Sequence, residues 1–303
     1  MRNLDKKRVV VSSVFLLGIL AMAVVLGLRR EDEPAFHGRK LSSWLEKLRD
    51  SRRANPEAVN AIQTIGTNGL PTLLRKLRRK DFILKNAVCD WLRLRHALPR
   101  PFTTEREEKA DAVTGFKILG PRARPALPAL EELLSDEWRS ASFAANAIGA
   151  IGPDGIPVLV NALKARKDIV RGYAAATLSQ VGPLGGAEAE AAAVLLTQQL
   201  KHPNPFLRCS AAIALGKVGA PPSVLPVLIA GALGDPQFPV RAECVTAMAT
   251  FTNQARSILQ YVERLTNDRS LLVQNNAFLA LRKLNSSMGA TNEDPKINAR
   301  LVK

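Results

Sequence analysis

The apolar positions of this chain follow helical spacing, and one unit of that pattern recurs along most of its length. The clearest copy runs from Ala144 to Leu163 (AANAIGAIGPDGIPVLVNAL), where one apolar helix ends at a Gly-Pro turn and the next begins. Runs with strand-like alternation are scarce. The pattern therefore predicts an all-α fold built from pairs of short helices.

The turns that close successive helix pairs recur at a regular interval. From Gly120 onward the closing positions lie 30 to 37 residues apart, and Thr252 and Asn285 take the place of glycine in the last two units. Glycine suits this place because it adopts the left-handed conformation that ends a helix. A period of this size is typical of a solenoid. The predicted turn residues are Gly66, Gly120, Gly152, Gly182 and Gly219.

A second column of residues keeps the same period. Eleven residues before the closing position, most units carry a long polar side chain: Lys109, Arg171, Arg208, Arg241 or Gln274. The interval of 54 residues between Gly66 and Gly120 breaks the period. We interpret it as one full unit with its second helix near residues 85–92, followed by an irregular unit whose helix covers residues 105–119. The repeats then fill residues 41–285, and residues 286–303 are predicted to be a flexible tail.

The N-terminal segment has a different character. Residues 9–28 contain no charged side chain, and as a helix of about 30 Å they are long enough to cross a bilayer. Basic residues dominate positions 1–8, which predicts a cytoplasmic N-terminus, a transmembrane signal anchor over 9–28, a spacer over 29–40 and a solenoid outside the cytoplasmic membrane. The alternative is a signal peptide cleaved near Ala21-Met22-Ala23, which would release a secreted or periplasmic protein.

The repeated pattern V-R-x-x-A-A-x-A-L-x-x-I-G-P, followed by P-x-L-x-x-L, resembles the HEAT repeat, and more narrowly the HEAT-like repeats named after the phycobilisome lyases. The segment 36–45 (FHGRKLSSWL) is also similar to the leader of bacterial membrane-anchored HEAT-repeat proteins. The resemblance implies a right-handed α-α superhelix of about seven helix pairs. It also implies that the second helices line the concave side, where partners of such proteins usually bind.

In this family the Arg column commonly bonds to a neighbouring acidic residue near the turn inside each unit, which makes a ladder that ties units together. Asp235 precedes Arg241 by six residues and Asp268 precedes Gln274 by six, which matches that pairing position. His202 and Ala165 occupy it in the two earlier units, so the ladder is expected to be incomplete. We interpret its members as structural: Arg171, Arg208, Arg241, Asp235 and Asp268.

The formal net charge of +16 is distributed unevenly. Residues 36–100 carry +10, residues 101–200 carry −2 and residues 201–303 carry +6. Each cation near an anionic headgroup contributes about 1 kcal/mol, so a basic end beside an anchor suits contact with a partner or a lipid surface. A solvated basic surface is the simpler interpretation, and nucleic-acid binding is the third. The candidate contact residues are Arg75, Lys76, Arg78, Arg79, Lys80, Arg93 and Arg95.

The sequence offers little that is typical of catalysis. The three cysteines, Cys89, Cys209 and Cys244, form no CxxC motif and are predicted to be small buried apolar residues. The three histidines are far apart, and no known catalytic motif is present. We therefore expect no enzyme, cofactor or metal. The expected function is a membrane-anchored scaffold whose concave surface binds an unidentified protein. A basic solenoid that binds nucleic acid is the first alternative, and a lyase-like accessory protein is the second.

Overall fold

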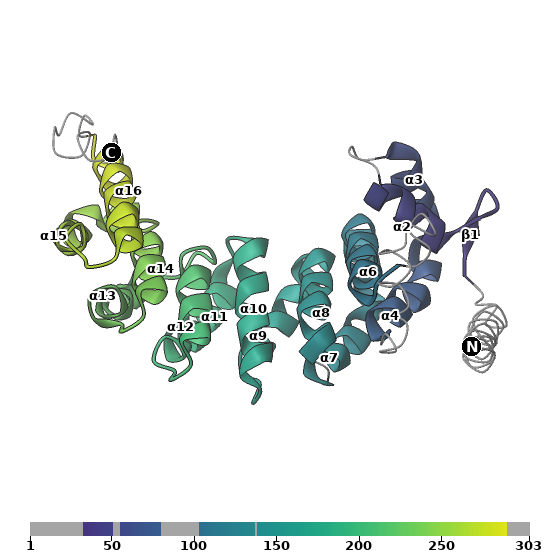
Figure 1. Cartoon of the computed structure of the whole chain (residues 1–303), viewed down its shortest axis with the longest axis horizontal. Helices are drawn as coiled ribbons and strands as arrows, with labels where there is room; N and C mark the ends of the chain where they lie inside the picture. Colours follow the sequence, from purple (N-terminus) through teal and green to yellow (C-terminus); the bar gives the residue numbers. More distant parts are fainter. Residues whose placement is uncertain (1–32, 51–54, 80–102, 137, 290–303) are drawn as a thin grey trace, which may run out of the picture.

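The computed structural model describes residues 33–50, 55–79, 103–136 and 138–289, which form two layers of helices bent into an open arch (Figure 1). Within these residues, consecutive helices contact each other as seven pairs. In chain order the pairs are α2 (Leu41–Asp50) with α3 (Pro56–Ile65), α4 (Leu70–Arg78) with α6 (Glu105–Leu119), α7 (Leu127–Asp136) with α8 (Trp138–Ile151), α9 (Ile156–Ala162) with α10 (Asp168–Val181), α11 (Gly186–Gln199) with α12 (Pro205–Leu215), α13 (Leu225–Gly234) with α14 (Phe238–Met248), and α15 (Ala255–Leu265) with α16 (Leu271–Ser287).

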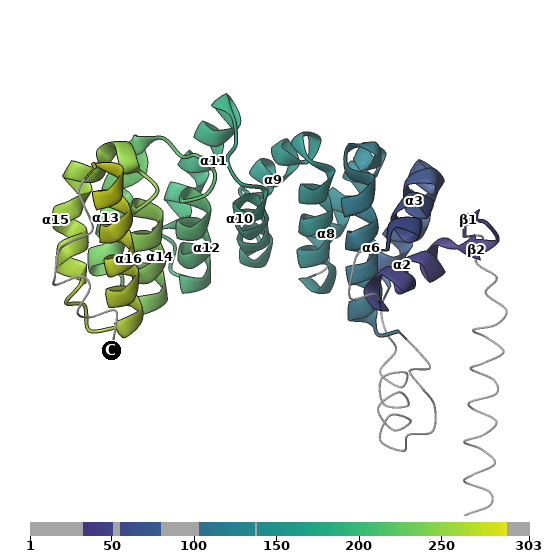
Figure 2. The ribbon, with the colours of Figure 1, turned by 90° about the horizontal axis from the view of Figure 1, so that it is seen from above.

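The second helices of the pairs form one continuous layer. Contacts run from α6 to α8 and on through α10, α12, α14 and α16. Figure 2 shows these helices side by side with their axes in a common direction, and Figure 1 shows them on the inner side of the arch. This arrangement confirms the predicted α solenoid with second helices on the concave side; its handedness stays a prediction.

The five predicted turn glycines all have the left-handed backbone conformation. Their φ angles are 59° at Gly66, 54° at Gly120, 90° at Gly152, 94° at Gly182 and 73° at Gly219. Short 3₁₀ helices follow several of the second helices: η1 (Gly66–Gly69), η2 (Gly120–Ala126), η3 (Pro153–Gly155), η4 (Pro222–Val224) and η5 (Thr252–Gln254). The prediction of a closing turn at Asn285 is wrong, because α16 continues through Ser287 and the left-handed glycine that follows it is Gly289, with φ of 76°.

The core is built from small and aliphatic side chains at the contacts between helices. Gly149 on α8 and Gly216 on α12 lie where the next second helix comes closest: an added Cβ would meet Thr177 at 2.6 Å and the Cα of Ala247 at 2.9 Å. Small residues at this place let neighbouring helices approach closely. The largest side chain of this core is Trp44, which is 1% exposed.

The segment before the first helix is more ordered than the predicted spacer. Strands β1 (Ala35–Phe36) and β2 (Arg39–Lys40) pair as an antiparallel hairpin. The hairpin lies against α2, since Trp44 Nε1 donates to the carbonyl of Phe36 at 3.3 Å.

Helix α2 begins at Leu41, and the Glu33 carboxylate caps it. The amide nitrogen of Ser42 donates to Glu33 Oε2 at 3.1 Å, and Ser42 Oγ donates to Oε1 at 2.8 Å. Residues 9–28 lie outside the described residues, so the transmembrane anchor stays a prediction. Within the described residues, none of the helices combines the length and apolar character needed to span a bilayer.

The long interval between Gly66 and Gly120 contains helices α4 and α6, which contact each other directly. In the sequence, residues 80–102 separate these two helices, and we call them the insertion. The proposed second helix, residues 85–92, lies outside the described residues, so the interpretation as one full and one irregular unit stays a prediction.

Candidate functional site

Two of the predicted ladder arginines bind an aspartate of the following unit through both arms of the guanidinium group. Arg208 Nε and Nη2 donate to Asp235 at 2.6 and 2.9 Å, and Arg241 Nε and Nη2 donate to Asp268 at 2.9 and 2.7 Å. Such paired, charge-assisted hydrogen bonds are among the stronger polar contacts in proteins. They connect α12 to the turn before α14, and α14 to the turn before α16.

The structure corrects the expected pairing within each unit. Each arginine donates to the backbone carbonyl of the residue six positions before it. Arg208 Nη1 donates to the carbonyl of His202, and Arg241 Nη1 donates to that of Asp235. Gln274 Nε2 makes the equivalent bond to the carbonyl of Asp268. Each arginine therefore fixes the turn of its own unit with one nitrogen, and its carboxylate partner belongs to the next unit.

The ladder changes at Arg171. Its guanidinium meets Asp168 on the same helix and His202 Nε2, which lies 3.1 Å away. The amide nitrogen of Asn204 donates to His202 Nδ1, so in the neutral ring the proton is on Nε2 and faces a guanidinium that can only donate. Arg171 Nε is buried and makes no hydrogen bond within the described residues. The boundary between α10 and α12 is bridged by a bond from Asn204 Nδ2 to Asp168 at 3.0 Å in place of a paired arginine–aspartate contact, and we call it the weak rung of the ladder.

Helix α6 carries a lysine in the arginine column. Lys109 is 1% exposed, and its ammonium donates to Glu105 at 2.6 Å and to Ser140 Oγ of α8 at 2.9 Å. The Ser140 hydroxyl in turn donates to the carbonyl of Leu77 on α4. This chain of bonds ties three helices together without an acid from the next unit.

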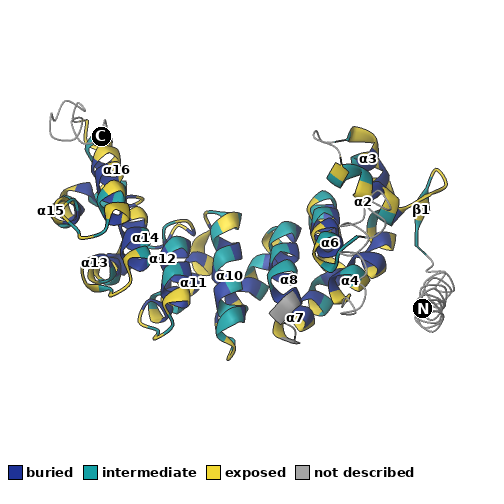
Figure 3. Ribbon diagram, in the orientation of Figure 1, coloured by how far each residue is buried: buried dark blue, intermediate teal, exposed yellow. Residues whose placement is uncertain are grey.

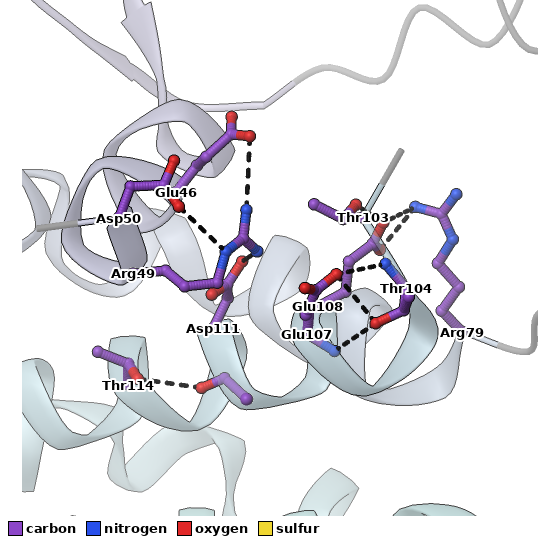
Figure 4. A network of polar contacts seen from close by, with 11 residues as sticks. Glu46, Arg49, Asp50, Arg79, Thr103, Thr104, Glu107, Glu108, Asp111 and Thr114 are labelled. Carbon is purple, nitrogen blue, oxygen red and sulfur yellow. Dashed lines mark hydrogen bonds and ion pairs between the residues drawn. The ribbon is translucent and has the colours of Figure 1, made fainter. Parts of the chain in front are cut away.

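Buried carboxylates hold the N-terminal units together (Figure 4). Arg49 Nη1 on α2 donates to Asp111 on α6 at 2.8 Å. Burial raises the pKa of Asp111 to about 6, although Arg49 and Lys76 act in the opposite direction. Glu108 is 3% exposed and accepts from Arg79 at 2.6 Å and from Thr103 at 2.6 Å. Because Arg79 and Thr103 flank residues 80–102, Glu108 joins the two ends of the insertion.

Three of the predicted basic contact residues lie in ion pairs. Arg75 lies 3.6 Å from Glu33, Arg78 lies 2.8 Å from Glu132, and Arg79 binds Glu108. Lys76 is half-buried and forms no ion pair with a described residue. Lys80, Arg93 and Arg95 lie outside the described residues. The role of this cluster in binding a partner or a lipid stays a prediction, although its charge is largely balanced where the structure describes it.

The sequence predicts buried cysteines, and this is confirmed for Cys244, whereas Cys209 is half-buried. Both are free thiols, and burial raises the pKa of Cys244 to about 12. Among the described residues no group of three or more His, Cys, Asp or Glu side chains is placed to hold a metal ion.

The second helices in the middle of the inner layer are uncharged beyond their first turns, which sequence reasoning missed. Phe143 on α8, Tyr173 on α10 and Ile213 on α12 are half-buried and come from three successive second helices. Figure 3 shows residues of intermediate burial on α8, α10 and α12. Beyond their first turns, residues 140–151, 172–181 and 209–215 contain no charged side chain. We call Phe143, Tyr173 and Ile213 the concave strip. A count of charge helix by helix, in place of the count by thirds of the chain, would have found it.

Comparison with known proteins supports the repeat assignment. Residues 184–249 match the family model of HEAT repeats. This match runs from α11 to α14 and includes the rung formed by Arg208 and Asp235. No curated protein matches the chain by sequence.

Three solved structures are similar to this chain at low sequence identity, and the first of them has a TM-score above 0.5 and shows the fold. A chain of the Kap95:Nup1 complex is 15% identical over 86% of this chain and 35% of that chain, with a TM-score of 0.53. The archaeal HEAT-like repeats protein from Thermococcus onnurineus NA1 is 12% identical over 84% and 100%, with a TM-score of 0.43. The complex of CpcE and CpcF of phycocyanin lyase from Nostoc sp. PCC7120 is 16% identical over 89% and 97%, with a TM-score of 0.40.

Proposed function

We propose that this chain, a HEAT-repeat protein, binds a segment of another protein along the concave strip of its arch. The carrying observation is the uncharged apolar centre formed by Phe143, Tyr173 and Ile213 on three neighbouring helices. Protein-binding surfaces combine a desolvated apolar centre with a polar rim, and charged side chains are depleted from that centre. Folds of the HEAT and armadillo type commonly bind proteins, which supports this role over a purely structural one.

The strip suits a segment that crosses several helices. Packed helices lie about 8–10 Å apart, so an extended chain that crosses them meets a new helix about every third residue. Each contact is modest, because the three side chains are half-buried already. Affinity would then come from the number of helices crossed.

Site-specific photo-crosslinking in cells tests this proposal. Tyr173 is replaced by p-benzoylphenylalanine, which keeps an aromatic ring at the strip. Val194 receives the same replacement as a control; it is 59% exposed and lies on α11, the first helix of its pair. We expect a discrete crosslinked protein from position 173 and none from position 194. Equal yields from both positions, or none from position 173, would contradict the proposal.

Membrane anchoring is the second part of the proposed function. Twenty uncharged residues, 9–28, behind a basic N-terminus support a signal anchor that leaves the solenoid outside the cytoplasmic membrane. Fusions of alkaline phosphatase and of green fluorescent protein to the C-terminus test the orientation. We expect active phosphatase in the membrane fraction. Active phosphatase in the soluble fraction would favour cleavage, and fluorescence without phosphatase activity would place the solenoid in the cytoplasm.

A further inference from the structure

We propose that the edge of the arch formed by the turns inside the C-terminal units docks on an anionic lipid surface. This inference rests on the proposed membrane anchor and adds a second contact to it. The second helices run side by side in a common direction, so their N-terminal ends follow one edge of the arch (Figure 2). We call this edge, from the turn before α10 to the turn before α16, the turn rim.

Large apolar side chains are exposed at the same place in three successive units of the rim. Phe206 is 46% exposed in the first turn of α12, Phe238 is 48% exposed at the start of α14, and Leu271 is 73% exposed at the start of α16. Leu272 beside Leu271 is 46% exposed, and Leu233 is 37% exposed near the end of α13, where the chain enters the turn. Most of the large exposed apolar residues of the described chain therefore lie on this rim.

The fold does not require these side chains at the rim. The earlier units carry both kinds of residue at this place: Asp168 begins α10 and Arg106 lies in the first turn of α6, whereas Trp138 begins α8. Asn204 caps α12 with its side chain. The ring of Phe206 lies over Gly172 of α10, and this contact buries only part of the ring. Polar residues therefore satisfy the same turns in the same fold, which leaves the apolar set unexplained by packing.

The charges around the rim favour an anionic partner. The exposed basic residues of its turns are Lys164, Arg166, Lys167, Lys201 and Arg269. The acidic residues of the same turns, Asp168, Asp235 and Asp268, are each bonded to a ladder arginine. Their negative charge is therefore already balanced inside the fold, and the surface that remains is cationic.

Apolar side chains next to exposed cations are the combination that binds the interface of an anionic bilayer. Rings and leucines enter the region between headgroups and acyl chains to a depth of about 5–10 Å, and lysines and arginines stay with the phosphates. A lipid surface is flat, so it can contact a row of separate side chains on successive units. Such contact requires only that these side chains lie along one edge of the arch. An anchor on the same chain holds the rim near the surface, which raises the effective concentration of the contact.

Depth-dependent fluorescence quenching tests the rim on the full chain in vesicles. An environment-sensitive fluorescent amino acid is placed at Phe238, at Leu271 or, as a control, at Val194 on α11, which is 59% exposed. Vesicles of phosphatidylcholine with 30 mol% phosphatidylglycerol carry a spin-labelled lipid as the quencher. We expect quenching at positions 238 and 271 but not at 194. We expect it to fall in pure phosphatidylcholine or in high salt, because the headgroup attraction is then lost.

Further variants separate the outcomes. Lys201→Glu and Arg269→Glu should each lower the fraction of docked rim by at least about fivefold, because each removes one cation near the headgroups. Absence of quenching at 238 and 271 would overturn the rim proposal, and so would equal quenching without anionic lipid. A label at Leu20 reports on the anchor separately. If the label at Leu20 is not quenched, the prediction of a membrane anchor is wrong. Quenching at positions 238 and 271 still decides whether the turn rim docks.

Discussion

The C-terminal units and the units before them use the same column of side chains in different ways. In the C-terminal units, Arg208 and Arg241 each bind an aspartate of the next unit through two hydrogen bonds. In the earlier units, Lys109 binds a serine hydroxyl and an acid of its own helix, and Arg171 faces the ring of His202. The repeat therefore keeps its backbone geometry while the polar link between units changes.

This difference teaches that the regular backbone does not depend on the ladder. The turn glycines and the small residues between helices occur on both sides of Arg171, so they are sufficient to stack the units. The complete rungs add a directed link between neighbours. We expect the last three units to open together and the boundary at Arg171 to open more easily.

The largest effect is expected from breaking a complete rung. Arg241→Met leaves the carboxylate of Asp268 without its partner in a site where the two side chains are only 4% and 11% exposed. Loss of one member of a buried pair costs about 3–5 kcal/mol. Hydrogen exchange of the α14 and α16 amides measures this loss. Arg171→Met at the weak rung should cost less than about 1 kcal/mol, and equal losses at both sites would refute the comparison.

The next effect concerns the buried acid of the N-terminal units. The pKa of Asp111 is raised to about 6 by burial, so the folded state binds this proton more tightly than the unfolded chain does. Stability should therefore rise as pH falls through 6, and the gain should be complete below the unfolded value of about 3.8. A shift of this size corresponds to about 3 kcal/mol.

Unfolding as a function of pH measures this prediction. The Asp111→Asn variant cannot titrate at this position, so its stability should be nearly level between pH 4 and pH 7 where the parent changes. The groups that act on Asp111 are Arg49, Lys76, Glu108 and Glu46, and all of them remain in the variant. An unchanged slope in Asp111→Asn would assign the effect to another group.

A smaller effect is expected from completing the weak rung. His202→Asp places an acceptor where the ring now presents its Nε2–H to Arg171, and an aspartate there can also accept from the amide of Asn204 as the ring does. We expect a gain of about 1–2 kcal/mol, in line with a hydrogen bond to a charged group. Hydrogen exchange at the boundary between α10 and α12 measures it. His202→Asn, which adds no charge, should gain less; a loss in His202→Asp would contradict the assignment.

The smallest effect is expected from breaking an exposed ion pair, which tests whether burial or the distance between the charged atoms determines the contribution to stability. Arg78 and Glu132 lie 2.8 Å apart, nearly as close as Arg241 and Asp268 at 2.7 Å, but their side chains are 50% and 61% exposed. Because water screens exposed pairs, Arg78→Ala should cost at most about 1 kcal/mol. Chemical denaturation of the two single variants compares them. A cost for Arg78→Ala as large as that for Arg241→Met would show that burial does not strengthen the contribution of the Arg241–Asp268 pair.

The sequence predicts well what depends on local chemistry. The turn glycines, the period and the arginine column follow from backbone preferences and helical spacing within one unit, and the structure confirms them. The pairing of Arg208 with Asp235 could not be derived in the same way. That choice depends on how one unit rotates against the next, which brings the following aspartate closer to the guanidinium than the preceding one.

Two other features depend on contacts between distant residues. Whether the segment after α4 is a unit or an insertion depends on which helix α4 packs against, and local pattern cannot distinguish these cases. The concave strip needs the face of each helix to be known, since Tyr173 and Ile213 look like ordinary core positions in the sequence. Their half exposure emerges only when the second helices are placed side by side.

The most direct test of the proposed function is a charge placed in the concave strip while crosslinking is read from its neighbour. Position 173 carries p-benzoylphenylalanine, and Ile213→Glu is introduced on the next helix; Leu279→Glu, at the 56% exposed residue of α16, is the matched control. We predict that Ile213→Glu lowers the crosslinked product at least tenfold with unchanged helix content by circular dichroism, and that Leu279→Glu leaves it intact. A crosslinked product that survives Ile213→Glu would contradict binding along the strip.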